Sequence, residues 1–263
     1  MAGPTAHGEA QEGEARWAAE EAAREAPAVA LECGGRERAS YTDAEGVVHI
    51  PGCFATPSFS PLREPAARVV SGAEVVFHTS DECYKTLSQL SQIPGQHARW
   101  TIGDTNAVTG PLHIEGAKPG DALRIDVLDV TVERCWSVWI ADDDISGCLA
   151  GKLAATGRRA AVRQLQIDRA SQTVQISERL HVPLEPMIGC IATAPEPHDE
   201  CQWNCGCSTL EPTFKHGGNM DLRELCKGAA IVLPVQNEGG LLFLGDLHAC
   251  MVSPILWRIC DML

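Results

Sequence analysis

The chain has 263 residues, of which 44% are hydrophobic, and a formal net charge of −14 at pH 7. A chain of this length can bury a sizeable core as one large domain or two small ones, and its hydrophobic content excludes global disorder. The acidic balance disfavours nucleic acid and anionic membranes as partners, and no apolar run is long enough to span a bilayer, so small molecules or proteins are the expected partners.

Residues 1–65 are predicted to form a poorly ordered, acidic and alanine-rich extension. Its first 31 residues favour helix by composition but carry almost no apolar stripe, and turn signals such as Pro51–Gly52 punctuate the remainder. The start of the chain lacks the basic and apolar segments of a secretory signal, which predicts a cytoplasmic protein. Most of the twelve cysteines are therefore expected to be buried or free thiols rather than disulfides.

Strands and turns are predicted from residue 66 onward, so the compact domain is expected over residues 66–251. Apolar and polar residues alternate along 121–127, as in a half-buried strand. Two hairpins are predicted, at residues 164–177 and 228–244. Helices are expected to be few, and the candidates are residues 83–92 and the segment that follows Asp221.

The strand that contains His113 and Glu115 offers a candidate acid/base group. Both side chains lie on the face opposite Leu112 and Ile114, next to glycines where a ligand can approach closely. A carboxylate at Glu115 can act as a general base if burial raises its pKa toward the working pH. The commoner alternative is an exposed glutamate on an edge strand.

Two later segments gather residue types that bind metals and move protons. Asn219 with Asp221, and Asp246 with His248, are each two residues apart, and on an extended backbone such residues point to the same side. Together the two pairs can hold a metal or activate a water. An alternative also fits the sequence, in which Asn219 and Asp221 cap a short helix and Asp246 closes a hairpin.

A second candidate metal site is the group His198, Cys201, Cys205 and Cys207. Its spacing lacks the paired C-x-x-C units of structural zinc sites. The chain has no G-x-S-x-G nucleophile elbow, no P-loop and no dinucleotide-binding fingerprint. These absences favour chemistry performed by carboxylates and histidine, with or without a metal.

Residues 108–129, 182–195, 216–221 and 245–249 carry four motifs in a fixed order, among them His216-Gly-Gly-Asn-Met-Asp221 and Gly245-Asp-Leu-His-Ala249. In that order they resemble the acetamidase/formamidase family of amide hydrolases. The resemblance covers roughly residues 66–250.

The resemblance implies a mainly β or α+β, β-sandwich-like fold with few helices, in a cytoplasmic homo-oligomer. It implies hydrolysis of short linear amides, such as formamide and acetamide, to the carboxylate and ammonia, assisted by a divalent metal, either zinc or calcium. Carried over by position, Glu115 and Asn219 are the expected catalytic residues, with Glu115 as the base that activates water. Asp221, Asp246 and His248 are the expected metal ligands.

Residues 252–263 depart from the family pattern, because an atypical tail replaces the family's last segment. The sequence therefore suggests a C-terminally truncated member and the hypothesis that truncation makes it inactive. An alternative of another class is a non-catalytic β-rich binding or assembly subunit.

Overall fold

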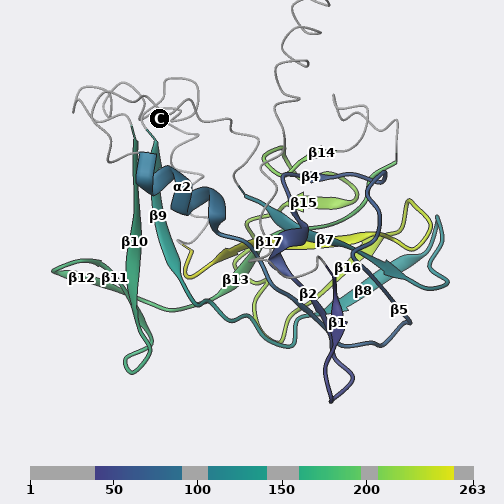
Figure 1. Ribbon diagram of the computed structural model, residues 1–263, viewed down its shortest axis with the longest axis horizontal. Coiled ribbons are helices and arrows are strands. Elements are labelled where there is room, and N and C mark those ends of the chain that lie inside the picture. Colours follow the sequence, from purple (N-terminus) through teal and green to yellow (C-terminus); the bar gives the residue numbers. More distant parts are fainter. Residues whose placement is uncertain (1–38, 91–105, 141–159, 197–206, 252–263) are drawn as a thin grey trace, which may run out of the picture. The chain divides into compact units, whose positions relative to one another are not determined.

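Strands dominate the part of the chain that the computed structural model describes, which comprises residues 39–90, 106–140, 160–196 and 207–251 (Figure 1). Within these ranges the chain forms one α-helix, α2 (Glu82–Leu90), and one short 3-10 helix, η1 (Gly52–Phe54). The prediction of a mainly β fold with few helices is confirmed. None of the described helices has the length and apolar character needed to cross a membrane.

The largest sheet has six strands and carries most of the residues that matter for the site. Its order is β15-β13-β17-β7-β3, and β5 also pairs with β7. All seven residues of β7 and of β13 are buried, as expected for central strands that are covered on both faces. The six strands are β3 (Ala55–Thr56), β5 (Ala67–Val69), β7 (Val108–Ile114), β13 (Met187–Thr193), β15 (Gly217–Asn219) and β17 (Leu242–His248).

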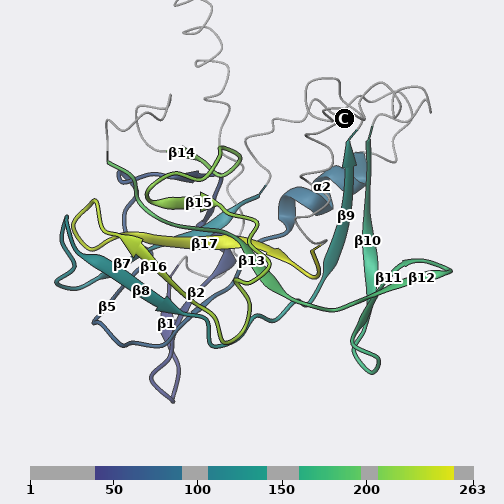
Figure 2. The same ribbon diagram turned by 180° about the vertical axis from the view of Figure 1, so that it is seen from behind.

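Two smaller sheets share one hydrophobic core with this large sheet. One is the antiparallel pair of β8 (Ala122–Asp126) and β16 (Ala230–Pro234), and the other contains β1 (Tyr41–Thr42), β2 (Val48–Ile50) and β6 (Val75–Phe77). Figure 2 shows the β8 and β16 pair from behind. The shared core contains Ile50 from β2, Leu112 and Ile191 from the large sheet, and Leu233 from β16. Packing of sheet against sheet gives the sandwich-like architecture that the resemblance implied.

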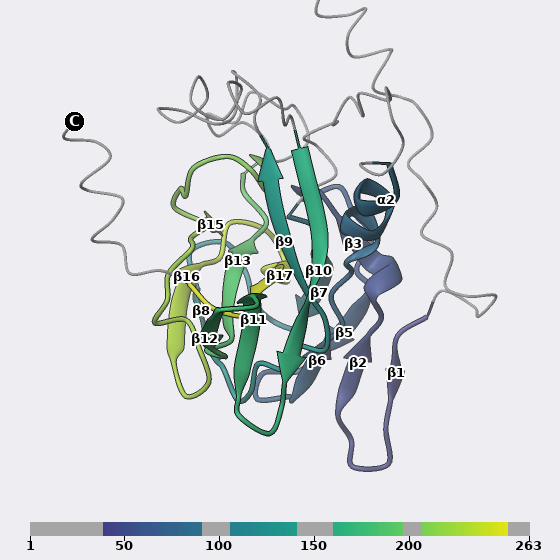
Figure 3. The ribbon, with the colours of Figure 1, turned by 90° about the vertical axis from the view of Figure 1, so that its left-hand side faces the viewer.

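A four-stranded sheet has the order β12-β11-β10-β9, and a short pair joins β4 (Ser58–Phe59) to β14 (Cys207–Ser208). The long β9 and β10 strands stand side by side in Figure 3, and α2 packs against β10. The hairpin predicted at 164–177 is confirmed, because Asp168 pairs with Thr173 across the turn. The four strands are β9 (Cys135–Ile140), β10 (Ala160–Asp168), β11 (Thr173–Ser177) and β12 (Leu180–Pro183).

Two local predictions are wrong, both for the same physical reason. Residues 228–244 do not form a hairpin, since β16 pairs with β8 whereas β17 pairs with β13 and β7. The segment after Asp221 forms a turn rather than a helix. In both segments long-range strand pairing outweighs the local turn and helix preferences from which the predictions were made.

Ordered structure begins earlier than the expected boundary at residue 66. Strands β1 to β4 lie within residues 39–65, β3 pairs with β7, and Phe59 is buried in the core. Residues 1–38 and 252–263 lie outside the described residues, so the predictions for the rest of the extension and for the tail stay predictions. Strands from residues 39–65 thus pair with strands from later segments of the chain.

Asp81 anchors the start of α2 to the sheet that begins with β9. Its carboxylate accepts hydrogen bonds from the Arg134 guanidinium at 2.6 and 2.8 Å, and from the Trp136 indole at 2.8 Å. Burial would raise the pKa of the Asp81 carboxyl, but the hydrogen bonds from Arg134 and Trp136 outweigh burial and lower this pKa from 3.8 to about 2. The helix is thus tied to β9 by a charged, hydrogen-bonded contact.

We expect Asp81→Asn to lower the free energy of unfolding at pH 7 by about 1 kcal/mol. The effect is small because the Arg134 side chain is 45% exposed. Since the folded-state pKa lies below the unfolded value of 3.8, the carboxylate's contribution is present above pH 3.8 and is lost as the pH falls toward 2. Urea denaturation at several pH values should therefore show the two proteins converging at low pH.

Asp126→Asn is the matched control, because it removes an exposed carboxylate that pairs with Arg124 on β8. No resolvable change in stability is expected for this control. Equal losses of stability in the two variants would contradict the anchoring role of Asp81.

Candidate functional site

Asp221, Asp246 and His248 form one cluster of oxygen and nitrogen ligand atoms. One ligand atom from each residue lies within 4.8 Å of the other two. The Nε2 atom of His248 is 3.4 Å from Asp221 Oδ1 and 3.4 Å from Asp246 Oδ2. The Asp246 side chain is only 10% exposed, whereas that of Asp221 is 40% exposed, so the cluster runs from the interior to the surface.

Strand β17 supplies Asp246 and His248, two residues apart as the sequence predicted. The third member, Asp221, follows β15, on the other side of β13. The carbonyl oxygen of Gly189 in β13 accepts hydrogen bonds from the backbone N–H groups of Met220 and Asp221, at 2.9 and 3.1 Å. Neither a hairpin end at Asp246 nor a helix cap at Asp221 is found, and Gly217–Asn219 is a strand.

Gly189 creates the space in which the two side chains from β17 lie. A Cβ atom at this position would stand 2.5 Å from the carbonyl oxygen of Asp246, 2.7 Å from Nε2 of His248 and 2.8 Å from Oδ2 of Asp246. No side chain fits at such distances without moving the strand or the cluster. Gly189 lies within the motif at residues 182–195, but no sequence pattern marks this role.

The backbone at both aspartates is in the left-handed region. The φ angle is 44° at Asp221 and 50° at Asp246. Non-glycine residues rarely adopt this conformation, and when they do they are concentrated at functional sites. At Asp246 the unusual backbone interrupts a strand that otherwise pairs in register with β13.

The electrostatics of the cluster favour a cation between the two carboxylates. The hydrogen bond with Asp246 raises the pKa of His248 above its usual value, and burial opposes this shift. Burial raises the pKa of Asp221, and the charge of His248 opposes that shift. Either a protonated imidazole or a metal ion can balance the negative charge.

The donor set fits a divalent metal. Two carboxylates and one imidazole nitrogen are ligands of catalytic zinc, whose sites keep a further position for water or substrate. Calcium takes oxygen ligands and is less suited to an imidazole. Asp221, Asp246 and His248 are therefore the residues that can hold a metal.

Cys190 and Asn219 lie beside the cluster and link it to β15. The Cys190 thiol is fully buried, and its one proton has three acceptors within reach: Asn219 Oδ1 at 3.5 Å, Asp246 Oδ2 at 3.6 Å and the Thr209 carbonyl oxygen at 3.6 Å. Burial, and then the charge of Asp246, raise the pKa of this thiol, so it stays protonated. Cys190 is thus a hydrogen-bond donor to the cluster rather than a nucleophile.

Glu115 is not brought to the cluster by any contact among the described residues. It lies in the turn after β7, its side chain is 51% exposed, and its carboxylate is 3.8 Å from Arg68 and from His113. It does not line the cavity into which Asp221, Asp246 and His248 face. Its predicted role as a base stays a prediction.

A cavity of about 1450 Å³, which we call the main cavity, includes all three members of the cluster in its lining. Among the other polar residues of its lining are Tyr84 from α2 and Asn106 from the segment before β7. Neither was singled out in the sequence analysis. No motif marks them, because they reach the cavity only through the packing of α2 and the pairing of β7 with β17.

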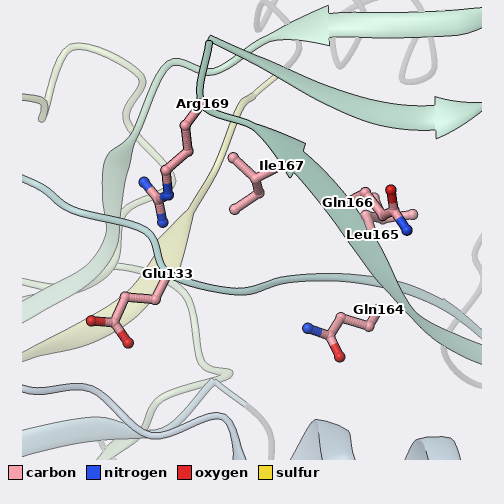
Figure 4. A pocket seen from close by; sticks show the side chains of 6 residues that line it. All are labelled: Glu133, Gln164, Leu165, Gln166, Ile167 and Arg169. Carbon is pink, nitrogen blue, oxygen red and sulfur yellow. The ribbon is translucent and has the colours of Figure 1, made fainter. Parts of the chain in front are cut away.

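A smaller cavity, of about 460 Å³, lies along β10 (Figure 4). Its lining includes the charged side chains Glu133 and Arg169, and Arg169 donates a hydrogen bond of 2.8 Å to the carbonyl oxygen of Val132. Among the described residues of this lining, Glu133 supplies the one carboxylate. This cavity offers no set of acid/base or ligand groups comparable with the cluster.

The alternative zinc site at 198–207 loses one of its four ligands. Cys207 is disulfide-bonded, and so is Cys53. A disulfide sulfur is not the thiolate that zinc requires. Five of the described cysteines are thiols outside any disulfide, as expected for most of them, whereas Cys53 and Cys207 are the described exceptions. The other three candidates, His198, Cys201 and Cys205, lie outside the described residues.

Comparisons with known proteins bear on the family of the chain. Residues 59–205 and 198–251 match the Acetamidase/Formamidase family. A formamidase of Methylophilus methylotrophus is 27% identical over 192 residues, which are 54% of this chain and 44% of that protein. The chain thus spans less than half the length of this curated relative.

Two solved structures are similar in fold. An acetamidase from Bacillus halodurans has a TM-score of 0.62 and 31% sequence identity, over 78% of this chain and 63% of that one. A predicted acetamidase/formamidase from Thermoanaerobacter tengcongensis has a TM-score of 0.64 and 29% identity, over 78% of this chain and 62% of its own. In both comparisons the chain spans less than two thirds of the solved protein.

Proposed function

Because the chain belongs to the acetamidase/formamidase family, we propose that it hydrolyses the carbon–nitrogen bond of short linear amides. The products are a carboxylate and ammonia, and formamide and acetamide are the substrates to test first. The observation that carries the proposal is the convergence of Asp221, Asp246 and His248 at the wall of the main cavity. Such a cluster supplies the acid/base and ligand groups that addition of water to an amide requires.

We propose that the cluster holds one divalent metal, with zinc favoured over calcium because His248 contributes nitrogen. A bound metal supplies Lewis-acid polarisation of the amide carbonyl and lowers the pKa of a bound water. The chain's own residues hold and orient the groups around it. Asp246 can accept a hydrogen bond from the Cys190 thiol, and the carbonyl oxygen of Gly189 accepts hydrogen bonds from the backbone N–H groups of Met220 and Asp221.

We propose that the substrate amide binds in the main cavity, next to the cluster. Asp221 is the more exposed carboxylate and can bind water or the substrate amino group there. The Cys190 thiol contacts both Asn219 and Asp246, so we propose that Asn219 positions the cluster through the thiol. A cysteine nucleophile is not part of this proposal, because the thiol of Cys190 is buried and protonated.

We expect Glu115→Gln to keep most of the amidase activity, within about threefold of the unchanged protein. Glu115 is half exposed and contacts Arg68 and His113, so removing its charge should leave the cluster intact. Steady-state ammonia release measures this effect. Glu45→Gln, in the exposed turn between β1 and β2, is the matched control.

A fall in kcat of about 100-fold or more for Glu115→Gln, with no change for Glu45→Gln, would instead support the role as base that the sequence predicted.

The experiment that tests the function measures ammonia release from formamide and acetamide by the purified chain, first treated with a chelator and then supplied with zinc or calcium. The proposal expects turnover that zinc restores. A folded sample that binds an amide or a partner without turnover would favour a non-catalytic binding or assembly subunit. Residence in the cytoplasm and a homo-oligomeric state stay predictions, and light scattering of the purified chain tests the second.

A further inference from the structure

Tyr84 reaches the main cavity beside the acidic cluster without belonging to it. The residue lies in the first half of α2 and lines the main cavity together with Asp246 and His248. Burial raises the pKa of the Tyr84 phenol, and the negative charge of Asp246 raises it further. The hydroxyl therefore keeps its proton and is a neutral hydrogen-bond donor in the lining of the main cavity.

Asn106 holds the Tyr84 hydroxyl and connects it to the strand that carries the cluster. The hydroxyl donates to Asn106 Oδ1 at 3.4 Å. Asn106 precedes β7 by two residues, and Val108 of β7 pairs with Gly245, the residue before Asp246. The backbone of Asn106 has a φ angle of 56°, a left-handed conformation that asparagine tolerates better than most residues.

The close approach of two backbones fixes this connection. A Cβ atom at Gly245 would stand 2.5 Å from the carbonyl oxygen of Ala107 and 2.6 Å from the Cα of Val108. The start of α2 is anchored by the contacts of Asp81, three residues before Tyr84, with Arg134 and Trp136. Tyr84 is therefore held from two directions at a defined place in the cavity wall.

A distance of 3.4 Å is long for a hydrogen bond from a hydroxyl group, whose usual donor–acceptor distance is about 2.7–2.8 Å. The bond to Asn106 orients the hydroxyl group but is a weak hydrogen bond for its proton. Such loose contacts in an empty site often shorten or exchange when substrate binds. The Tyr84 proton is thus available to an acceptor that enters the cavity next to the cluster.

We propose that the Tyr84 hydroxyl, oriented by Asn106, binds the carbonyl oxygen of the substrate amide. This inference rests on the proposed amidase function and names a residue for it. When water adds to the carbonyl carbon, the carbonyl oxygen gains negative charge, and a neutral donor already in place stabilises that charge. The proton stays on Tyr84 throughout, so the residue is not altered in the cycle.

Two tyrosines are present in the chain, Tyr41 and Tyr84, which makes the test unusually clean. Tyr84→Phe removes only the hydroxyl and is expected to lower kcat/KM for acetamide by about 100-fold, as loss of one such donor does in other enzymes. Tyr41→Phe is the matched control, because Tyr41 is 54% exposed and stacks on His49 away from the cavity lining. This control should leave kcat/KM unchanged.

A second readout separates binding from turnover. Protein labelled with 3-fluorotyrosine has two fluorine resonances, and Tyr84→Phe identifies which belongs to Tyr84. Added acetamide should shift the Tyr84 resonance and leave that of Tyr41 in place. Asn106→Gly, which keeps the left-handed backbone but removes the side chain, should weaken the shift.

The outcomes distinguish this inference from the proposed function. Turnover that is equal in Tyr84→Phe and the unchanged protein would overturn the role of Tyr84 and leave the amidase function standing. Absence of turnover in every variant would overturn the amidase function, and the fluorine resonance would then decide whether Tyr84 binds an amide. No shift of that resonance at saturating acetamide would overturn the inference in either case.

Discussion

Replacing Asp246 by asparagine is expected to lower amide turnover by about 1000-fold or more, with little effect on folding. Asparagine has nearly the same shape as aspartate but carries no negative charge. That charge attracts the His248 imidazole, and the carboxylate oxygen that carries it is an acceptor for the Cys190 thiol. Loss of that charge removes one ligand of the proposed metal and the partner that keeps His248 in place. Ammonia release from formamide measures turnover, and equilibrium dialysis measures bound zinc.

The matched control for this variant is again Asp126→Asn, an exposed carboxylate on β8 that pairs with Arg124. It should keep full turnover and full zinc content. If Asp246→Asn turned over amide as fast as the unchanged protein, the cluster would not be the site of the chemistry.

The second large effect is expected for Gly189→Ala, which places a methyl group where the cluster now lies. The added Cβ would be 2.5 Å from the backbone oxygen of Asp246 and 2.7 Å from the His248 ring. The backbone oxygen of Asp246 cannot move aside as the end of a flexible side chain can. Either β13 and β17 must therefore move apart, or the side chains of Asp246 and His248 must adopt other positions. We expect a loss of about 2–3 kcal/mol in the free energy of unfolding, together with loss of zinc binding.

Chemical denaturation and zinc dialysis of Gly189→Ala test this prediction. Gly72→Ala is the control, because a Cβ at Gly72 meets no atom within 4 Å and only its backbone conformation, with a φ angle of 88°, opposes the change. That control should lose about 1 kcal/mol at most and keep its zinc. Normal stability and zinc binding in Gly189→Ala would contradict the packing described here.

The part of the site that the sequence predicts is the part carried by local spacing. Asp246 and His248 are two residues apart on an extended backbone, and this alone places them on one side of β17. Their meeting with Asp221 depends on β13, which lies between the two segments and has no charged residue to signal it. The spacing of the residues does not predict this meeting. The order of the motifs does, because it indicates a family resemblance that assigns Asp221, Asp246 and His248 to one site.

Residues that act through packing escaped the sequence analysis. Gly189 and Cys190 occupy a strand buried on both faces, where a glycine and a small thiol look like ordinary core residues. Tyr84 lies on α2, and the position of α2 is set by its packing against β10, which no local sequence pattern predicts. The predicted hairpin at 228–244 failed similarly, since turn signals specify a reversal of the chain but not which sheet each strand joins.

The most direct test of amide hydrolysis at the cluster is to measure both products in one reaction. The purified chain, loaded with zinc, is incubated with formamide, and ammonia and formate are quantified together, in parallel with Asp246→Asn. The account predicts equal amounts of ammonia and formate from the unchanged chain and neither product from the variant. Equal product formation by both proteins, or none from a folded and zinc-loaded unchanged chain, would contradict it.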